Sequence, residues 1–200
     1  MNRALVILIL IAAACRKHET PAAVSVPPPM PEMAGMSSTQ PPPAPNAPVL
    51  ADGRIREEVI EARRRGVIFD IGHGGGSFGF RTAEGMLASG FLPDVISSDV
   101  HALSINGPAF DQLTTMSKFL CLGMGLVEVI RASTLAPAAA LGRQDLGSLE
   151  SGAVGDATLL ELAEGQFDYR DVLGESRSGR WRLNLRGLVV AGRRWPPHQA

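Results

Sequence analysis

The prolines of this chain are concentrated in one stretch near its N-terminus. Ten of the 15 prolines fall between Pro21 and Pro48, with triplets that begin at Pro27 and Pro41. Such a composition cannot pack a core and favours extended, partly polyproline-II conformations. We therefore expect residues 16–48 to form a disordered tether. The 152 residues that follow have an ordinary globular composition and are enough for one modest domain.

The first fifteen residues have the pattern of an export signal. Arg3 supplies a positive charge, the run from Ala4 to Ala14 is apolar, and three alanines precede Cys15. This resembles a bacterial lipoprotein signal, and the resemblance implies a lipid on Cys15 that anchors the exported chain to a membrane. The alternatives are an ordinary cleaved signal, or a misassigned gene start that would leave the protein in the cytoplasm.

Charge and composition exclude several classes of protein. The net charge of −1 provides no basic field for a phosphate backbone, and 5% aromatic residues provide few stacking platforms, so we expect no nucleic-acid partner. Two cysteines, Cys15 and Cys121, cannot build a disulfide framework. No apolar run reaches the ~20 residues of a spanning helix, which argues against a multi-span membrane protein.

The globular part begins with alternating helix and strand signals, which indicate an α/β fold. Apolar residues recur at helical spacing from Ile55 and predict a helix that ends near Gly66. The apolar runs 67–71 and 94–98 are bounded by turn residues and predict two buried strands. Residues 82–89 between them predict a helix. Strand, helix and strand within ~30 residues form a βαβ unit, so the two strands should be parallel.

The second half of the globular part changes character. Two amphipathic helical stripes, around residues 113–120 and 126–130, are followed by Pro137, which can begin a third helix. After Gly142 the helical signal is lost. Short alternating or apolar runs separated by glycines predict a small antiparallel β module; they are 157–162, 167–169, 181–185 and 188–191.

The residues best suited to chemistry lie where the two parallel strands should end. His73 follows the first strand, Asp99 closes the second, and His101 comes two residues later. Ligands bind at the carboxyl ends of strands in parallel α/β folds, so these side chains could share a divalent cation or orient a water molecule. The alternative is that Asp99 caps a turn and the histidines are satisfied structural residues.

The glycine-rich stretch between these elements fits three motifs. Gly74, Gly76 and Gly79 match the dinucleotide pattern G-x-G-x-x-G, with Asp99 twenty residues further on. The same stretch contains HGGG, an oxyanion-hole motif, and G-x-S-x-G around Ser77, a nucleophile elbow. The esterase interpretation is weak because the only late histidine, His198, lies in a Pro-rich tail. A further alternative is that the glycines only allow a tight turn.

Three longer stretches resemble the C-terminal part of the amidohydrolase superfamily, nearest to its dihydroorotase-like amidohydrolase/deacetylase group. They are FDIGHGGGSFGF (69–80), LPDVISSDVHALSINGP (92–108) and TTMSKFLCLGMGLVEVIRASTLAPAAALG (114–142), and the match continues through LGSLESGAVGDATLLEL (146–162). The resemblance implies a TIM barrel that hydrolyses C–N bonds of small amide substrates with one or two divalent metals, usually zinc. Residues 49–142 would be the last two β/α units of the barrel, 143–195 a composite β module and 196–200 a tail.

The resemblance also implies roles for single residues. Asp99 would bind the metal and take a proton from the attacking water, while His73 and His101 would contact substrate. The family's H-x-H pair, bridging lysine and two further histidines have no counterparts here, because His18 stands alone and neither Lys17 nor Lys118 has the right context. We therefore expect a truncated chain that is inactive unless a partner chain completes the barrel. The alternative is a membrane-tethered remnant or binding module without catalysis.

Overall fold

The computed structural model describes residues 5–9, 47–50 and 52–195. Within the predicted signal peptide, residues 5–9 form strand β1 (Leu5–Ile9), which pairs with a strand of the β module. Cys15, residues 16–46 of the predicted tether and the predicted tail at 196–200 lie outside the described residues. The predictions made for them therefore stay predictions.

Two short parallel strands confirm the predicted βαβ unit. Strands β2 (Asp70–Gly72) and β3 (Val95–Ser97) pair in register, and helix α2 (Phe80–Ala88) lies between them in the chain. Strand β2 begins later than predicted, and Val67 and Ile68 stay exposed. Phe69 still bonds to the segment that leads into β3, because its carbonyl accepts from the Asp94 and Val95 amides at 3.0 and 3.1 Å, whereas Val67 and Ile68 make no backbone hydrogen bond to that segment.

Helix α1 (Glu57–Arg64) confirms the first predicted helix and is held to this unit by one arginine. The Arg63 guanidinium carbon lies 3.5 Å from the centroid of the Phe91 ring. The same side chain donates hydrogen bonds to the Leu92 carbonyl at 2.7 Å and to the Asp94 carboxylate at 2.9 Å. These contacts fix α1 beside the segment that leads into β3.

Three helices follow β3, two where the apolar stripes predict them and a third that contains Pro137. They are α3 (Gln112–Cys121), α4 (Leu126–Ser133) and α5 (Leu135–Ala140). Asp111 caps α3 by accepting a hydrogen bond from the backbone N–H of Thr114. Helix α5 begins two residues before Pro137, where a residue without an N–H is still tolerated in the first turn. Among the described helices, none combines the length and the hydropathy of a membrane span.

The β module contains two long strands where four short runs were predicted. Strands β4 (Ala157–Arg170) and β5 (Ser176–Val190) form an antiparallel hairpin, flanked by β1 on one side and by β6 (Arg193–Trp195) on the other. The prediction of breaks at the glycines was wrong, because Gly165, Gly179 and Gly187 lie inside the strands. The pairing register shifts near Gly165, which lets the hairpin bend without ending.

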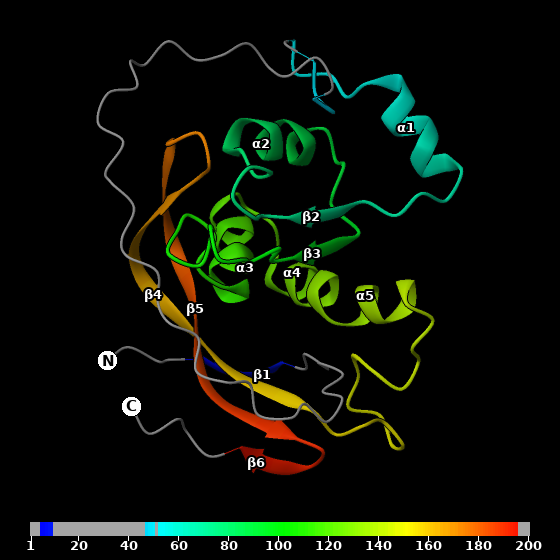
Figure 1. Cartoon of the computed structure of the whole chain (residues 1–200), viewed down its shortest axis with the longest axis vertical. Helices are drawn as coiled ribbons and strands as arrows, with labels where there is room; N and C mark the ends of the chain where they lie inside the picture. The colour runs from blue at the N-terminus through cyan, green and yellow to red at the C-terminus, as the bar shows by residue number, and fades with distance from the viewer. Residues whose placement is uncertain (1–4, 10–46, 51, 196–200) are drawn as a thin grey trace.

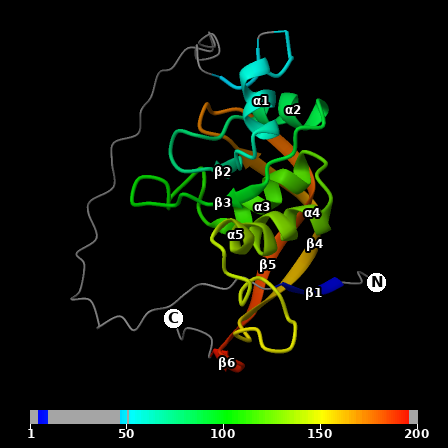
Figure 2. The ribbon, with the colours of Figure 1, turned by 90° about the vertical axis from the view of Figure 1, so that its right-hand side faces the viewer.

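One apolar core joins the two parts of the molecule. Figure 1 shows α3 between the β4–β5 hairpin and the β2–β3 pair, and Figure 2 shows the same layers from the side. The core combines side chains from β3, α3, α4 and the hairpin; its members include Phe78, Phe80, Ile96, Met116, Phe119, Val129, Leu160, Tyr169 and Leu183. The described fold is therefore an α/β unit whose helical face is covered by an antiparallel sheet.

Candidate functional site

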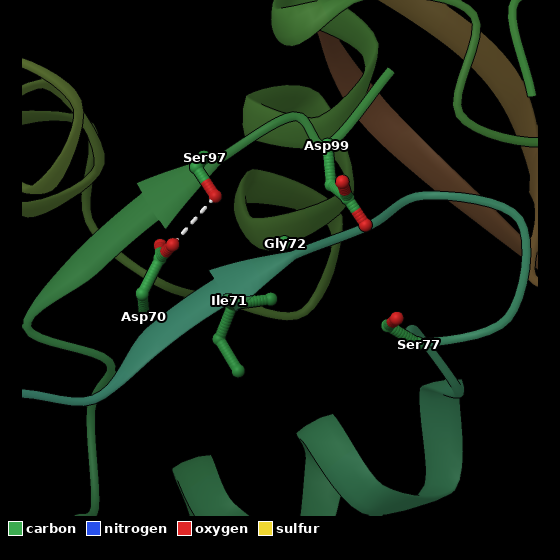
Figure 3. Close-up of a pocket in the computed structure, with 6 residues that line it drawn as sticks. All are labelled: Asp70, Ile71, Gly72, Ser77, Ser97 and Asp99. Carbon is green, nitrogen blue, oxygen red and sulfur yellow. Dashed lines mark hydrogen bonds between the residues drawn. The ribbon is translucent and has the colours of Figure 1, made fainter. Parts of the chain in front are cut away.

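A pocket lies at the carboxyl ends of β2 and β3, where the sequence predicted a site. Its volume is about 540 Å³ and it is open to solvent. Figure 3 shows the residues that line it; they are Asp70, Ile71, Gly72, Ser77, Ser97 and Asp99. The pocket contains two carboxylates and two hydroxyl groups, a lining suited to polar ligands.

Asp99 lies on the rim of this pocket in a strained backbone conformation. Its φ angle is +46°, in the left-handed region that non-glycine residues seldom adopt. Two glycines make room for its side chain: a Cβ on Gly72 would lie 3.0 Å from the Asp99 Cβ, and a Cβ on Gly74 would overlap the Asp99 carboxylate. The Gly74 amide also donates to the Ser98 carbonyl at 3.0 Å, which joins the two strand-end loops.

The two carboxylates of the pocket have different surroundings. Asp70 accepts a hydrogen bond of 2.7 Å from the Ser97 hydroxyl. Figure 3 shows this pair apart from Asp99, whose carboxylate lies beyond the end of β2. Within the described part of the chain, no hydrogen bond or ion pair engages the Asp99 carboxylate. Asp99 is therefore the carboxylate that is available for a ligand or a proton.

His101 follows Asp99 and lies against the glycine-rich loop. Its ring is exposed, and its Nδ1 accepts a 3.2 Å hydrogen bond from the backbone N–H of Leu103. A backbone N–H can only donate, so in the neutral ring the proton is on Nε2. Nε2 lies 3.7 Å from the position of a Cβ on Gly75. His101 thus presents a hydrogen-bond donor beside the loop that borders the pocket.

His73 is placed differently from His101, because its ring is fully buried. Its Nδ1 lies 3.0 Å from the Gly74 carbonyl, its Nε2 lies 2.5 Å from the Lys118 Nζ, and the ring stacks on Phe78. Burial lowers the pKa of His73, which favours the neutral ring. Groups of the chain itself engage both ring nitrogens, so the predicted substrate contact, which stays a prediction, requires a rearrangement.

Lys118 is a buried cation that the sequence analysis considered only as a metal bridge. Its Nζ donates to His73 Nε2 and to the carbonyl oxygens of Pro108 and Arg170, both at 2.7 Å. Burial lowers its pKa to about 8, while the charge of Asp171 raises it. Helical periodicity does not mark Lys118 as buried, because it lies outside the apolar stripe of Leu113, Met116, Phe119 and Leu120.

Asp171 is a second buried charge that sequence analysis missed. It accepts hydrogen bonds from the backbone N–H groups of Phe80, Leu173 and Glu175, at 2.8–2.9 Å. The first of these groups is at the N-terminus of α2, where a dinucleotide fold would bind a pyrophosphate. A carboxylate of the β module therefore occupies that position, which argues against the dinucleotide interpretation.

The esterase interpretation lacks support in the arrangement of Ser77. The serine does lie between a strand and a helix, as a nucleophile elbow requires. In the described ranges, however, no histidine forms a hydrogen bond with its hydroxyl, and His198 lies outside them. A serine nucleophile needs a base within hydrogen-bond reach.

A complete metal site is not formed by the residues that the structure describes. They contain no group of three or more His, Cys, Asp or Glu side chains that could hold an ion. A catalytic zinc needs three protein ligands and an open position. Asp99 supplies one suitable carboxylate, so the described residues alone do not fit such an ion.

Sequence comparisons relate most of the globular part to one family. The sequence profile of the amidohydrolase family matches residues 77–193. A deacetylase of Agrobacterium fabrum is 39% identical over 110 residues, which are 55% of this chain and 27% of that protein. A deacetylase of Enterococcus faecalis is 32% identical over 143 residues, which are 71% of this chain and 39% of that protein. The chain thus spans less than half of the curated relatives it matches.

Solved structures give the same relationship. The crystal structure of an adenine deaminase matches 74% of this chain and 41% of its own, with a TM-score of 0.71 and 31% identity. The crystal structure of a dihydroorotase matches 70% of this chain and 39% of its own, with a TM-score of 0.63 and 33% identity. The described fold is therefore similar to a part of each of these enzymes.

Proposed function

Because the chain belongs to the amidohydrolase family, we propose that it provides the last two strand ends of a barrel enzyme that hydrolyses C–N bonds. In this proposal β2 and β3 are the final strands of a TIM barrel, and the substrate is a small amide or cyclic amide. The observation that carries the proposal is the unengaged carboxylate of Asp99 at the carboxyl end of β3. The names of its relatives, two deacetylases, an adenine deaminase and a dihydroorotase, support this reaction class.

Asp99 acts as the general base of the proposed reaction. Its carboxylate takes a proton from a water molecule whose oxygen attacks the substrate carbonyl carbon, and returns that proton to the nitrogen as the C–N bond breaks. His101 presents its Nε2–H to an oxygen of the substrate, because its Nδ1 is engaged by Leu103. The substrate should therefore carry a carbonyl or carboxylate acceptor next to the amide.

The proposal includes a divalent cation, usually zinc in this family, and Asp99 would supply one of its oxygen ligands. Such an ion lowers the pKa of bound water. Because the described residues alone do not supply its ligands, we propose that a partner polypeptide provides them. Within the described part of the chain, β2 and β3 pair only with each other, so each has a free edge at which a strand could add.

The test compares the full chain alone with the chain mixed with candidate partner polypeptides. The proposal expects stoichiometric zinc and hydrolysis of N-acetylated or cyclic amides in the complex, with both lost in Asp99→Asn. Asp70→Asn is the matched control, because it removes the other carboxylate of the same pocket and should retain metal. A complex in which Asp99→Asn binds zinc and hydrolyses amides as well as wild type does would overturn the proposal.

A second candidate is a non-catalytic binding module. The observation that favours it is the lack of a metal-holding group of side chains among the described residues. Saturable binding of one small ligand that is unchanged by chelators and by Asp99→Asn would support this candidate. The predicted lipid anchor on Cys15 is part of both candidate functions. If Cys15 carries this lipid, Cys15→Ser should release the exported protein from the membrane fraction.

A further inference from the structure

Lys118 carries a charge into the core of the molecule. Its side chain is 1% exposed, and its Nζ lies 5.6 Å from the centroid of the Phe78 ring. A buried ammonium is costly unless each of its N–H groups finds an acceptor. Its position on α3 makes it a neighbour of both strand-end loops and of the β module.

The three N–H groups of the ammonium meet three acceptors from separate segments. One is His73 Nε2 in the loop after β2, one is the Pro108 carbonyl in the loop after β3, and one is the Arg170 carbonyl at the end of β4. An ammonium has three donors, so this set satisfies it completely. Lys118 therefore ties the two strand-end loops to each other and to the hairpin.

The hydrogen bond from Lys118 to His73 determines which ring nitrogen carries the proton, and this nitrogen faces the glycine-rich loop. Because Lys118 donates to Nε2, the proton of the neutral ring is on Nδ1, which donates to the Gly74 carbonyl at 3.0 Å. Gly74 is the residue that lies against the Asp99 carboxylate. A continuous series of contacts thus runs from Lys118 through His73 and Gly74 to Asp99.

We propose that Lys118 is a positioning residue that fixes the His73 ring and, through it, holds the glycine-rich loop against Asp99. The assignment of Asp99 as the reacting group rests on the proposed function, whereas the contacts of Lys118 do not. None of the three hydrogen bonds of Lys118 reaches a residue of the pocket lining, and the one that reaches the glycine-rich loop is the bond to His73. If Lys118 only filled the core, its replacement would leave the His73 tautomer and the loop unchanged.

The test uses the full chain and measures the loop directly, without an activity assay. In wild type, ¹⁵N NMR of the His73 ring should report a proton on Nδ1 and an unprotonated Nε2. Lys118→Met should mix the two tautomers. It should also speed amide hydrogen exchange at Gly74 and Ser77, whose amides donate to the Ser98 and His73 carbonyls, by roughly tenfold or more, the size expected for a lost hydrogen bond to a charged group. Lys118→Arg, which keeps donors and charge, should restore part of the protection.

Ser117→Ala is the matched control on the same helix. Ser117 links α3 to β5 by accepting from the Leu183 amide at 3.0 Å, and it makes no hydrogen bond with the strand-end loops. It should lower stability and leave the His73 tautomer unchanged. If Lys118→Met does not fold, Lys118→Gln is measured in its place. The proposal is overturned by a proton on Nε2 in wild type, by unchanged loop exchange in the Lys118 variants, or by an equal effect of Ser117→Ala.

Discussion

The ammonium of Lys118 and the imidazole of His73 meet at 2.5 Å in the interior, although neither side chain carries a negative charge. The contact is stable only while the ring stays neutral and accepts the hydrogen bond. Burial lowers the pKa of both groups, for Lys118 to about 8. The pair therefore couples the stability of the strand-end loops to pH.

The first prediction concerns alkaline pH. In the unfolded chain Lys118 releases its proton near pH 10.5, and in the folded chain near 8, so between these values the unfolded state binds more protons. Stability should then rise with pH across this window, by at most about 3 kcal/mol. This gain in stability is lost again as the pH falls toward 8. Urea unfolding at several pH values measures this gain as the difference in the free energy of unfolding between wild type and Lys118→Met.

This difference isolates Lys118 from two other groups that titrate in the same range. Burial raises the pKa of the Cys121 thiol and of the Tyr169 hydroxyl, but both groups are present in wild type and in Lys118→Met. A stability difference between the two proteins that stays flat from pH 8 to 10.5 would contradict the depressed pKa of Lys118.

The second prediction concerns Gly74, whose φ is +46°. In Gly74→Ala the new methyl group must displace the Asp99 carboxylate, and the left-handed backbone adds a cost of about 1 kcal/mol. Urea unfolding measures the stability loss, and the ¹³C shift of the Asp99 carboxyl reports its displacement. Gly76→Ala is the control, because a Cβ there meets nothing within 4 Å and φ is not positive. Equal effects of the two substitutions would contradict this account of the loop.

The third prediction concerns Asp171. Asp171→Asn should destabilise the fold by about 2 kcal/mol, because a buried carboxylate that accepts three backbone hydrogen bonds is replaced by a neutral group. It should also lower the pKa of Lys118 further, since the charge of Asp171 raises it. Asp168→Asn, at an exposed residue of β4 that accepts from Ser178, should change stability by less than about 0.5 kcal/mol. Thermal unfolding of both variants measures the two stability changes, and equal changes would contradict the role given to Asp171.

The fourth prediction concerns the glycines inside β5. A Cβ on Gly179 would lie 2.9 Å from the Cys121 Cβ, whereas a Cβ on Gly187 would meet only Leu159 at 4.0 Å. Gly179→Ala should cost about 1–3 kcal/mol through overpacking, and Gly187→Ala close to nothing. The first substitution should also speed modification of Cys121 by a thiol reagent, because it loosens the contact that buries the sulfur. Equal stability of the two variants would show that the hairpin does not pack closely against α3 at Gly179.

The βαβ unit and the position of the pocket could be predicted from sequence because they depend on local patterns. Two apolar runs with a helical stripe between them predict parallel strands, and parallel strands bring their carboxyl ends together. The position of Asp99 at the end of the second strand was predicted in this way, and the residue lines the pocket, whereas its role stays a prediction. Its free carboxylate could not be predicted, since that depends on the space left by Gly72 and Gly74.

The partners of the buried charges could not be predicted, because they come from segments far apart in the chain. Lys118 and Arg170 are 52 residues apart, and Phe80 and Asp171 are 91 residues apart. The strand ends predicted at the glycines of the hairpin were wrong for a related reason. Gly179 lies between the polar residues Ser178 and Arg180 in the sequence, but in the fold it gives space to Cys121 and Tyr169, which contact it from the core.

The shared core of Phe119, Leu160, Tyr169 and Leu183 limits how the chain can be divided. Removal of the β4–β5 hairpin would strip the apolar covering from α3 and at the same time take away the Arg170 carbonyl that Lys118 requires. A fragment that stops at residue 142 would thus expose a hydrophobic surface and an unsatisfied cation together. Limited proteolysis between residues 142 and 157 should consequently yield two pieces that stay associated, and neither piece should keep a cooperative folding transition after separation.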